Sequence, residues 1–298
     1  MKSVLAVLVN FGDEQLKYLQ KVVSELKSFD KYNVHVVVHS NIDLPTIKDI
    51  DEVKIISEVE LRNLLLESTI TIPRAIRNSG SIHQNLHNHM LPLTCKKTIW
   101  ENKDNYDVFI FGENDHLFKQ HHIDKHLFYT KILPKNRIAG LMQYEENEEG
   151  RFYPAYHENW VWDMWNVEIY NGLRFCHFLN IHQASFILTQ QQLLDIGKKF
   201  DFTGYFGDDS YSTKCKVNTD IYEYCGMKKI ICISEFEDNI IHHLPNYYAS
   251  GKNGRHKFGA SEETMQKDLE KMFDWPNWLW GVTGRKKKKE FWLKNLES

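Results

Sequence analysis

The sequence predicts an α/β fold in which a mostly parallel central sheet is flanked by helices. Apolar runs of strand length alternate with segments whose apolar residues recur every three or four positions, starting with a run at residues 3–9 and a helical segment at residues 16–26. A second β-branched run follows at residues 34–38. Strand–helix–strand alternation of this kind is typical of parallel sheets that are covered by helices on both faces.

The remaining elements follow in chain order. Residues 53–56 fit a short third strand, and residues 59–66 fit a helix. A helix at residues 91–101 precedes the most clearly buried strand, at residues 106–111. Further expected elements are strands at 138–142, 184–188 and 229–233, an acidic turn at 145–150, an irregular aromatic segment at 153–165, and helices at 190–199, 219–224 and 262–273.

The composition narrows the class of protein. A chain of 298 residues with 42% hydrophobic content can bury a sizeable core, and a net charge of −3 gives no reason to expect nucleic acid as a partner. Five cysteines without C-x-x-C spacing, and the lack of an apolar stretch of about 18 residues, predict a soluble cytoplasmic protein. Because the sequence contains no internal repeat and no low-complexity linker, we expect one domain over residues 1–258 and a helical extension over residues 259–298.

The strongest candidate for a functional site is the acidic triplet Glu113-Asn114-Asp115, directly after the strand at residues 106–111. In open α/β sheets, ligands bind beyond the carboxyl ends of the strands. Two carboxylates at this place could hold Mn²⁺ or Mg²⁺ against a diphosphate, and the ion would neutralise the charge of a departing diphosphate. A solvated acidic turn is the alternative interpretation.

This strand and triplet resemble the strand and DxD-type motif of GT-A glycosyltransferases, with Glu in place of the first Asp. Residues 180–189 resemble the acceptor-side strand of these enzymes, and residues 237–247 resemble a C-terminal block of glycosyltransferase-like proteins. The resemblance extends over about residues 2–248. It implies a GT-A-like catalytic domain that moves a sugar from a nucleotide diphosphate donor to a hydroxyl of a glycan or lipid-linked glycan.

The resemblance also implies a metal site and a base. Asp115, with Glu113 and one imidazole of the His242-His243 pair, would hold the Mn²⁺ or Mg²⁺ ion, and the sequence does not distinguish the two histidines. An inverting transferase needs a carboxylate that takes the proton of the acceptor hydroxyl. The candidates for this base are Asp209 and Asp208. A cap for the following segment is the alternative, and the stereochemical outcome stays open.

Donor and acceptor contacts complete the predicted site. The basic loop at residues 251–257 could close over the diphosphate, although a solvated loop is an equal alternative. The donor-side candidates are Asn10, Glu113, Asn114, Lys252, Arg255 and Lys257. Flat aromatic rings could stack on an acceptor sugar, although such rings more often build the core. The acceptor-side candidates are Trp160, Trp162, Asp163 and His182.

The C-terminal basic run is a candidate membrane contact, and two other functions are alternatives to sugar transfer. The basic run at residues 285–289, followed by apolar residues 291–293, is a candidate for peripheral membrane contact, with a solvated tail as the alternative. A metal-dependent phosphohydrolase would use the same Asp and His ligands. A non-catalytic carbohydrate-binding protein with a degenerate transferase site would keep the aromatic residues and bind sugars without metal. The sequence lacks the G-x-S-x-G motif of Ser-His-Asp hydrolases and the G-x-G-x-x-G motif of dinucleotide-dependent oxidoreductases, which disfavours both classes.

Overall fold

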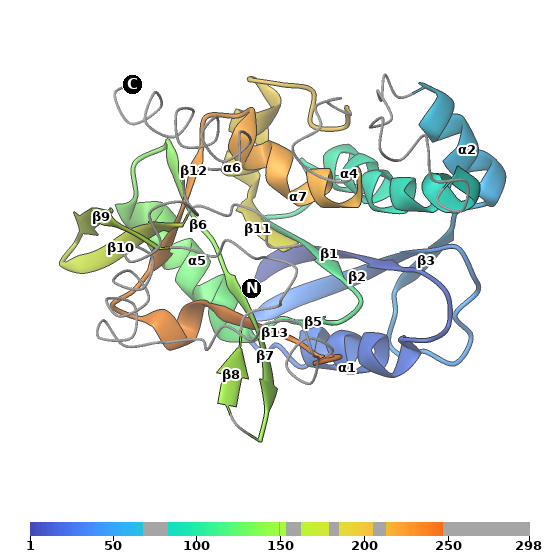
Figure 1. Cartoon of the computed structure of the whole chain (residues 1–298), viewed down its shortest axis with the longest axis horizontal. Coiled ribbons are helices and arrows are strands. Elements are labelled where there is room, and N and C mark those ends of the chain that lie inside the picture. The colour runs from blue at the N-terminus through green and yellow to red at the C-terminus, as the bar shows by residue number, and fades with distance from the viewer. Residues whose placement is uncertain (68–82, 149, 153–161, 179–184, 205–212, 247–298) are drawn as a thin grey trace, which may run out of the picture.

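The computed structural model describes residues 1–67, 83–148, 150–152, 162–178, 185–204 and 213–246. A five-stranded sheet with the order β11-β4-β1-β2-β3 forms the centre of the fold (Figure 1). Its strands are β1 (Lys2–Asn10), β2 (Tyr32–Ser40), β3 (Glu52–Ile55), β4 (Val108–Glu113) and β11 (Ser185–Thr189). The first four run parallel and β11 is antiparallel to β4, which confirms the prediction of a mixed α/β fold with a mostly parallel central sheet.

Helices cover both faces of this sheet, because β1 is apolar on both of its sides. Leu5, Val7 and Val9 enter one core, and the alternate residues of β1 enter the other. Figure 1 shows α2, α4 and α7 on one side of the sheet and α1 on the other. The first three helices contribute buried residues to the first core, and α1 contributes to the second. Each fully buried Val or Leu stabilises the fold by about 1.5–3 kcal/mol relative to an exposed one. The helices are α1 (Leu16–Lys27), α2 (Glu58–Glu67), α4 (Leu91–Glu101), α5 (Gln120–Ile132), α6 (Gln190–Gly197) and α7 (Thr213–Glu223), with 3₁₀ segments η1 (His83–Met90) and η2 (Phe236–Asn239).

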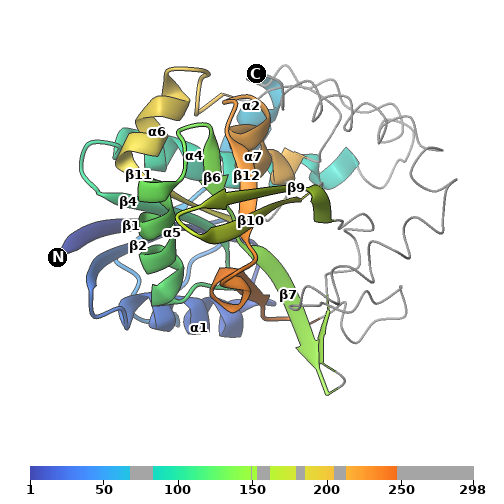
Figure 2. The same ribbon diagram turned by 90° about the vertical axis from the view of Figure 1, so that its left-hand side faces the viewer.

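Two smaller sheets lie beside the central one. The first has the order β5-β13-β7-β8, and its β7–β8 hairpin extends away from the rest of the described chain (Figure 1 and Figure 2). Its strands are β5 (His116–Leu117), β13 (Ile240–His243), β7 (Met142–Asn147) and β8 (Gly150–Phe152). The second has the order β6-β12-β10-β9. Its strands are β6 (Arg137–Ala139), β12 (Lys228–Cys232), β10 (Leu173–Phe178) and β9 (Trp162–Tyr170).

Three local predictions are wrong. The single strand expected at residues 138–142 is divided between β6 and β7, which belong to different sheets. The acidic turn expected from residue 145 is instead the end of β7, and Glu145 is fully buried there. The segment expected to be irregular up to residue 165 becomes strand β9 at Trp162, while residues 153–161 lie outside the described chain.

The predicted helices agree with the structure more closely. The helix expected at residues 91–101 is α4, and the one expected at residues 219–224 is the last part of a longer α7. Helix α5 was not predicted. The expected helix at 262–273 and the boundary between 258 and 259 lie outside the described residues. No helix in the described part of the chain is long and apolar enough to cross a membrane.

Candidate metal centre

The turn from β4 into β5 forms the first half of the site. Asp115 lies in this turn, between the end of β4 at Glu113 and the start of β5 at His116. Asn114 Nδ2 donates a 2.7 Å hydrogen bond to Asn10 Oδ1, which joins the turn to the carboxyl end of β1. A Cβ on Gly112 would lie 2.6 Å from Cε2 of Phe118, so any other residue here would have to displace that ring. The turn is therefore fixed at the carboxyl edge of the central sheet.

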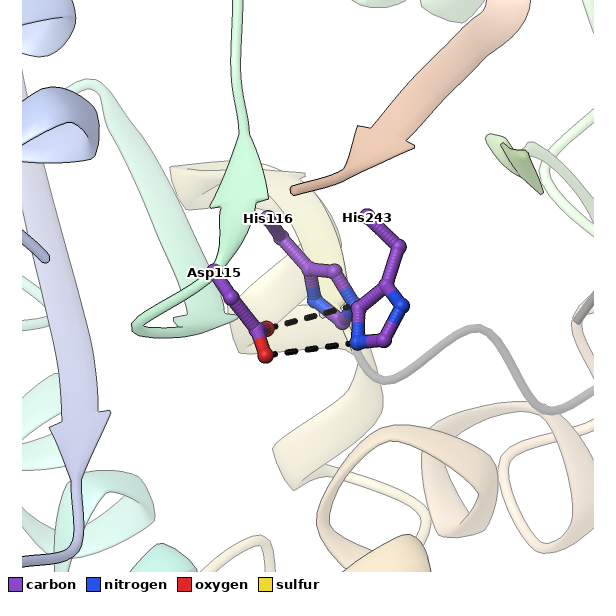
Figure 3. A group of neighbouring side chains, drawn as sticks. All are labelled: Asp115, His116 and His243. Carbon is purple, nitrogen blue, oxygen red and sulfur yellow. Dashed lines mark ion pairs between the residues drawn. The ribbon is translucent and has the colours of Figure 1, made fainter. Parts of the chain in front are cut away.

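Strand β13 brings the second half from far along the chain. His243 pairs with His116 across the antiparallel β5–β13 ladder, and the backbone N–H of Leu244 donates to the carbonyl of Asp115. Figure 3 shows the side chains of Asp115, His116 and His243 pointing toward one another. Asp115 Oδ2 lies 3.3 Å from His243 Nε2, and Asp115 Oδ1 lies 3.9 Å from His116 Nε2. All three ligand atoms lie within 4.8 Å of one another.

The chemistry of these atoms fits a cation. The three side chains are buried, and Asp115 Oδ1 is a buried oxygen without a hydrogen-bond partner. A buried carboxylate oxygen without a donor is costly unless a cation satisfies it. Carboxylate oxygen and imidazole nitrogen are both ordinary ligands of divalent ions. This group could therefore hold a metal ion.

The alternation of β13 selects between the two neighbouring histidines. Successive side chains of a strand point to opposite faces, so His242 and His243 cannot both face Asp115. His242 instead stacks on Tyr144, with ring centroids 4.8 Å apart and planes 11° apart. Its Nε2 lies 3.0 Å from Asn246 Oδ1. Of the pair, His243 belongs to the ligand group and His242 does not.

Strand β7 supplies polar partners for both imidazoles. His243 Nδ1 donates to Glu145 Oε1 over 2.5 Å, which directs Nε2 toward Asp115. Gln143 Nε2 lies 3.1 Å from His116 Nε2. Gln143 and Glu145 are two residues apart on β7 and fully buried, so both face the site. A carboxylate behind a histidine fixes the ring and its tautomer in many metal sites.

The electrostatics of the site are dominated by His243 and the acids around it. Burial disfavours the charged imidazolium, but hydrogen bonds to Asp115 and Glu145 outweigh this cost and raise the pKa of His243 to about 10. Although burial opposes it, the hydrogen bond to His243 holds the pKa of Asp115 below its usual value. Burial and the nearby charge of Asp115 raise the pKa of Glu113 to about 7.

The other predicted site residues have separate outcomes. Glu113 lies next to the ligand group and outside it. Asn10 is buried, and its amide bonds to Gly12, Ser40 and Asn114, so it organises the sheet edge. Trp162 and Asp163 are the first two residues of β9. The remaining candidates lie outside the described residues and are Trp160, His182, Asp208, Asp209, Lys252, Arg255 and Lys257.

Sequence reasoning assigned no role to three residues of this centre: His116, Gln143 and Glu145. His116 directly follows the acidic triplet, and that adjacency was a usable signal. Gln143 and Glu145 have the two-residue spacing of one strand face, but the expected strand ends at residue 142 and the expected acidic turn begins at residue 145.

Comparisons with known proteins add no family to this description. Neither a protein-family model nor the sequence of a curated protein matches the chain. The function of the chain is therefore inferred from the residues and geometry of the metal centre.

Proposed function

We propose that this chain is a metal-dependent glycosyltransferase that moves a sugar from a nucleotide diphosphate donor to a hydroxyl acceptor on a glycan or glycolipid. The observation that carries the proposal is the convergence of Asp115, His116 and His243 at the carboxyl edge of a mostly parallel sheet. Ligands of open α/β sheets bind at this edge. A strand followed by an acidic motif is also what the resemblance to GT-A enzymes leads us to expect.

The side chains of the centre have distinct roles in this proposal. Asp115, His116 and His243 would hold a divalent cation, which as a Lewis acid would stabilise the negative charge of the departing diphosphate. Glu113 lies beside them with a pKa of about 7, raised by burial and by Asp115. Near neutral pH its carboxyl group can therefore donate a hydrogen bond to a hydroxyl of the nucleotide sugar, or accept one from it. Asp209 or Asp208 remains the proposed base for the acceptor hydroxyl.

Binding of nucleoside diphosphates, with and without a divalent metal, tests this proposal. A ligand at about 100 times its Kd stabilises the folded state by about 2.7 kcal/mol. For a chain of 298 residues this raises Tm by about 4 °C. We expect this shift only when nucleotide and metal are both present. Asp115→Asn should abolish it, whereas His242→Gln should retain it because His242 faces away from the site.

The alternatives give different outcomes in the same experiment. A phosphohydrolase would release phosphate from simple phosphoesters in the presence of metal. A carbohydrate-binding protein would respond to free sugars without metal. Nucleotide binding that is equally strong without metal, or that survives Asp115→Asn, would contradict the proposed site.

A further inference from the structure

The donor atoms of the centre differ from those that the acidic triplet predicts. Two acids flanking Asn114 would offer oxygen ligands, which suit Mn²⁺ and Mg²⁺ equally. The structure instead brings together one carboxylate and two imidazoles. Glu113, the first acid of the triplet, lies outside that group.

We infer that this centre selects the late first-row metal ions Co²⁺ and Zn²⁺ over Mg²⁺ and Ca²⁺, with Mn²⁺ between them. The inference deepens the metal site of the proposed function and does not depend on the sugar-transfer reaction. Mg²⁺ and Ca²⁺ are hard cations that take oxygen ligands, and Mg²⁺ gives up its water reluctantly. Imidazole nitrogen favours zinc and its transition-metal neighbours, and affinity at such sites rises from Mn²⁺ through Co²⁺.

His116 is the residue that changes the selectivity. Without it the centre would contain one carboxylate and one imidazole, and so a single nitrogen ligand. His116 is fully buried, and its ring centroid lies 5.4 Å from that of His243. The β5–β13 ladder holds the two residues opposite each other. The second nitrogen ligand is therefore fixed by the backbone pairing of the sheet.

The distances are close to those of a bound ion. Ligands with bonds of about 2.0–2.1 Å to a tetrahedral ion lie about 3.4 Å apart. Asp115 Oδ2 and His243 Nε2 are 3.3 Å apart, and Asp115 Oδ1 and His116 Nε2 are 3.9 Å apart. One oxygen of Asp115 and the two imidazole nitrogens lie within 4.8 Å of one another, so small side-chain shifts would bring these three atoms onto one ion. A metal at His116 Nε2 would replace the Gln143 amide, now 3.1 Å away, as the partner of that nitrogen.

Three protein ligands leave at least one coordination position for water or a diphosphate oxygen. Catalytic zinc sites commonly have this arrangement, whereas structural zinc sites have four protein ligands. The carboxylate of Glu145 behind His243 is a further feature that metal-binding imidazoles share. The centre therefore has the ligands, the spacing and the supporting carboxylate of an open transition-metal site.

Metal titrations of the full chain without nucleotide test the inference. The Kd values of Zn²⁺, Co²⁺, Mn²⁺ and Mg²⁺ are measured by calorimetry and by competition with a chromophoric chelator. We expect one site, absent in Asp115→Asn, that binds Zn²⁺ and Co²⁺ at least about 100-fold more tightly than Mg²⁺. If Mg²⁺ binds the native chain within about tenfold of Co²⁺, the inference is wrong.

A matched pair of variants assigns the selectivity to His116. His116→Gln replaces the imidazole with a side chain of similar size, and His242→Gln makes the same change on the opposite face of the sheet. We expect the first variant to weaken Co²⁺ binding by at least about tenfold with Mg²⁺ binding unchanged, and the second to change neither. An unchanged Co²⁺ to Mg²⁺ ratio in a folded His116→Gln chain would overturn the inference. If this variant does not fold, the native Kd ratios still decide the matter.

These outcomes separate the inference from the proposed function. A selective centre in a chain that binds no nucleoside diphosphate would contradict the proposed function and leave the inference intact. Donor binding that Mg²⁺ supports as well as Co²⁺ would contradict the inference alone.

Discussion

Metal binding at this centre should release a proton from His243, so the affinity for metal should rise with pH. Hydrogen bonds to Asp115 and Glu145 outweigh the cost of burial and raise the pKa of His243 to about 10. Below that pKa, the proton on Nε2 competes with the metal for the same lone pair. Below the pKa of His243, each rise of one pH unit weakens this competition tenfold. The dependence ends at about pH 10, where the imidazole becomes neutral. At pH 7 the competition costs about 3 pH units, or roughly 4 kcal/mol of metal-binding free energy.

Glu113 should add to this dependence in the acidic part of the range. Its pKa is raised to about 7 by burial and by the charge of Asp115. A nearby cation favours the carboxylate, so metal binding below about pH 7 should release a second proton. Glu113→Gln removes that second group without changing the ligand set. In this variant one proton should be released over the whole range.

Calorimetry in buffers with different ionisation enthalpies measures both effects. In Glu113→Gln we expect the metal to bind about 100-fold more tightly at about pH 8 than at about pH 6, with one proton released per ion. The native chain should release more than one proton at the lower pH. A Kd that changes less than about threefold over this range would show that His243 does not carry the competing proton, and the proposed ligand assignment would fail.

Three further predictions concern stability. Burial holds three histidines neutral in the fold, with pKa values of about 3, 3 and 4, in His39, His122 and His126. The unfolded chain protonates these residues below about pH 6.5, while the raised pKa of Glu113 offsets about one of the three protons. Urea unfolding should therefore show a loss of about 2 kcal/mol between about pH 6.5 and 5.5, and a flat profile would contradict their burial as neutral groups. Tyr129→Phe removes the hydroxyl that joins α5 to η2 and should cost about 1–3 kcal/mol in the same assay, with an unchanged m-value. Gly197→Ala should cost about 1–3 kcal/mol because its Cβ would lie 2.1 Å from the ring of Trp100, and an unchanged midpoint would show that the ring moves aside freely.

Much of the central sheet was predictable because its signals are local. The runs of apolar residues that predict β4 and α4 each lie within a short window of sequence. The position of Asp115 at the sheet edge followed from β4 alone, since parallel strands end at a common edge. For these elements, the pattern of apolar residues and the tertiary packing favour the same structure.

The other half of the site depends on pairing between distant strands. Glu145 looked like part of a turn because acidic side chains are seldom buried without a partner. Its partner His243 is 98 residues away, on a strand that lies beside β7 only in the folded chain. The choice between His242 and His243 likewise depends on strand register, and a shift of one residue would reverse it. Sequence periodicity contains no information about either pairing.

The charges of the buried groups also favour a dication at this centre. Asp115 and Glu145 are two buried carboxylates, and they contact opposite nitrogens of the same imidazole. A protonated His243 contributes one positive charge against their two negative charges, which leaves the group with a net charge of −1. A divalent ion bound to neutral His243 would balance both carboxylates. Since uncompensated buried charge is costly, a metal ion in place of the proton would satisfy these two carboxylates better than the proton does. The register that places Glu145 behind His243 therefore sets both the orientation of that imidazole and the negative charge around it.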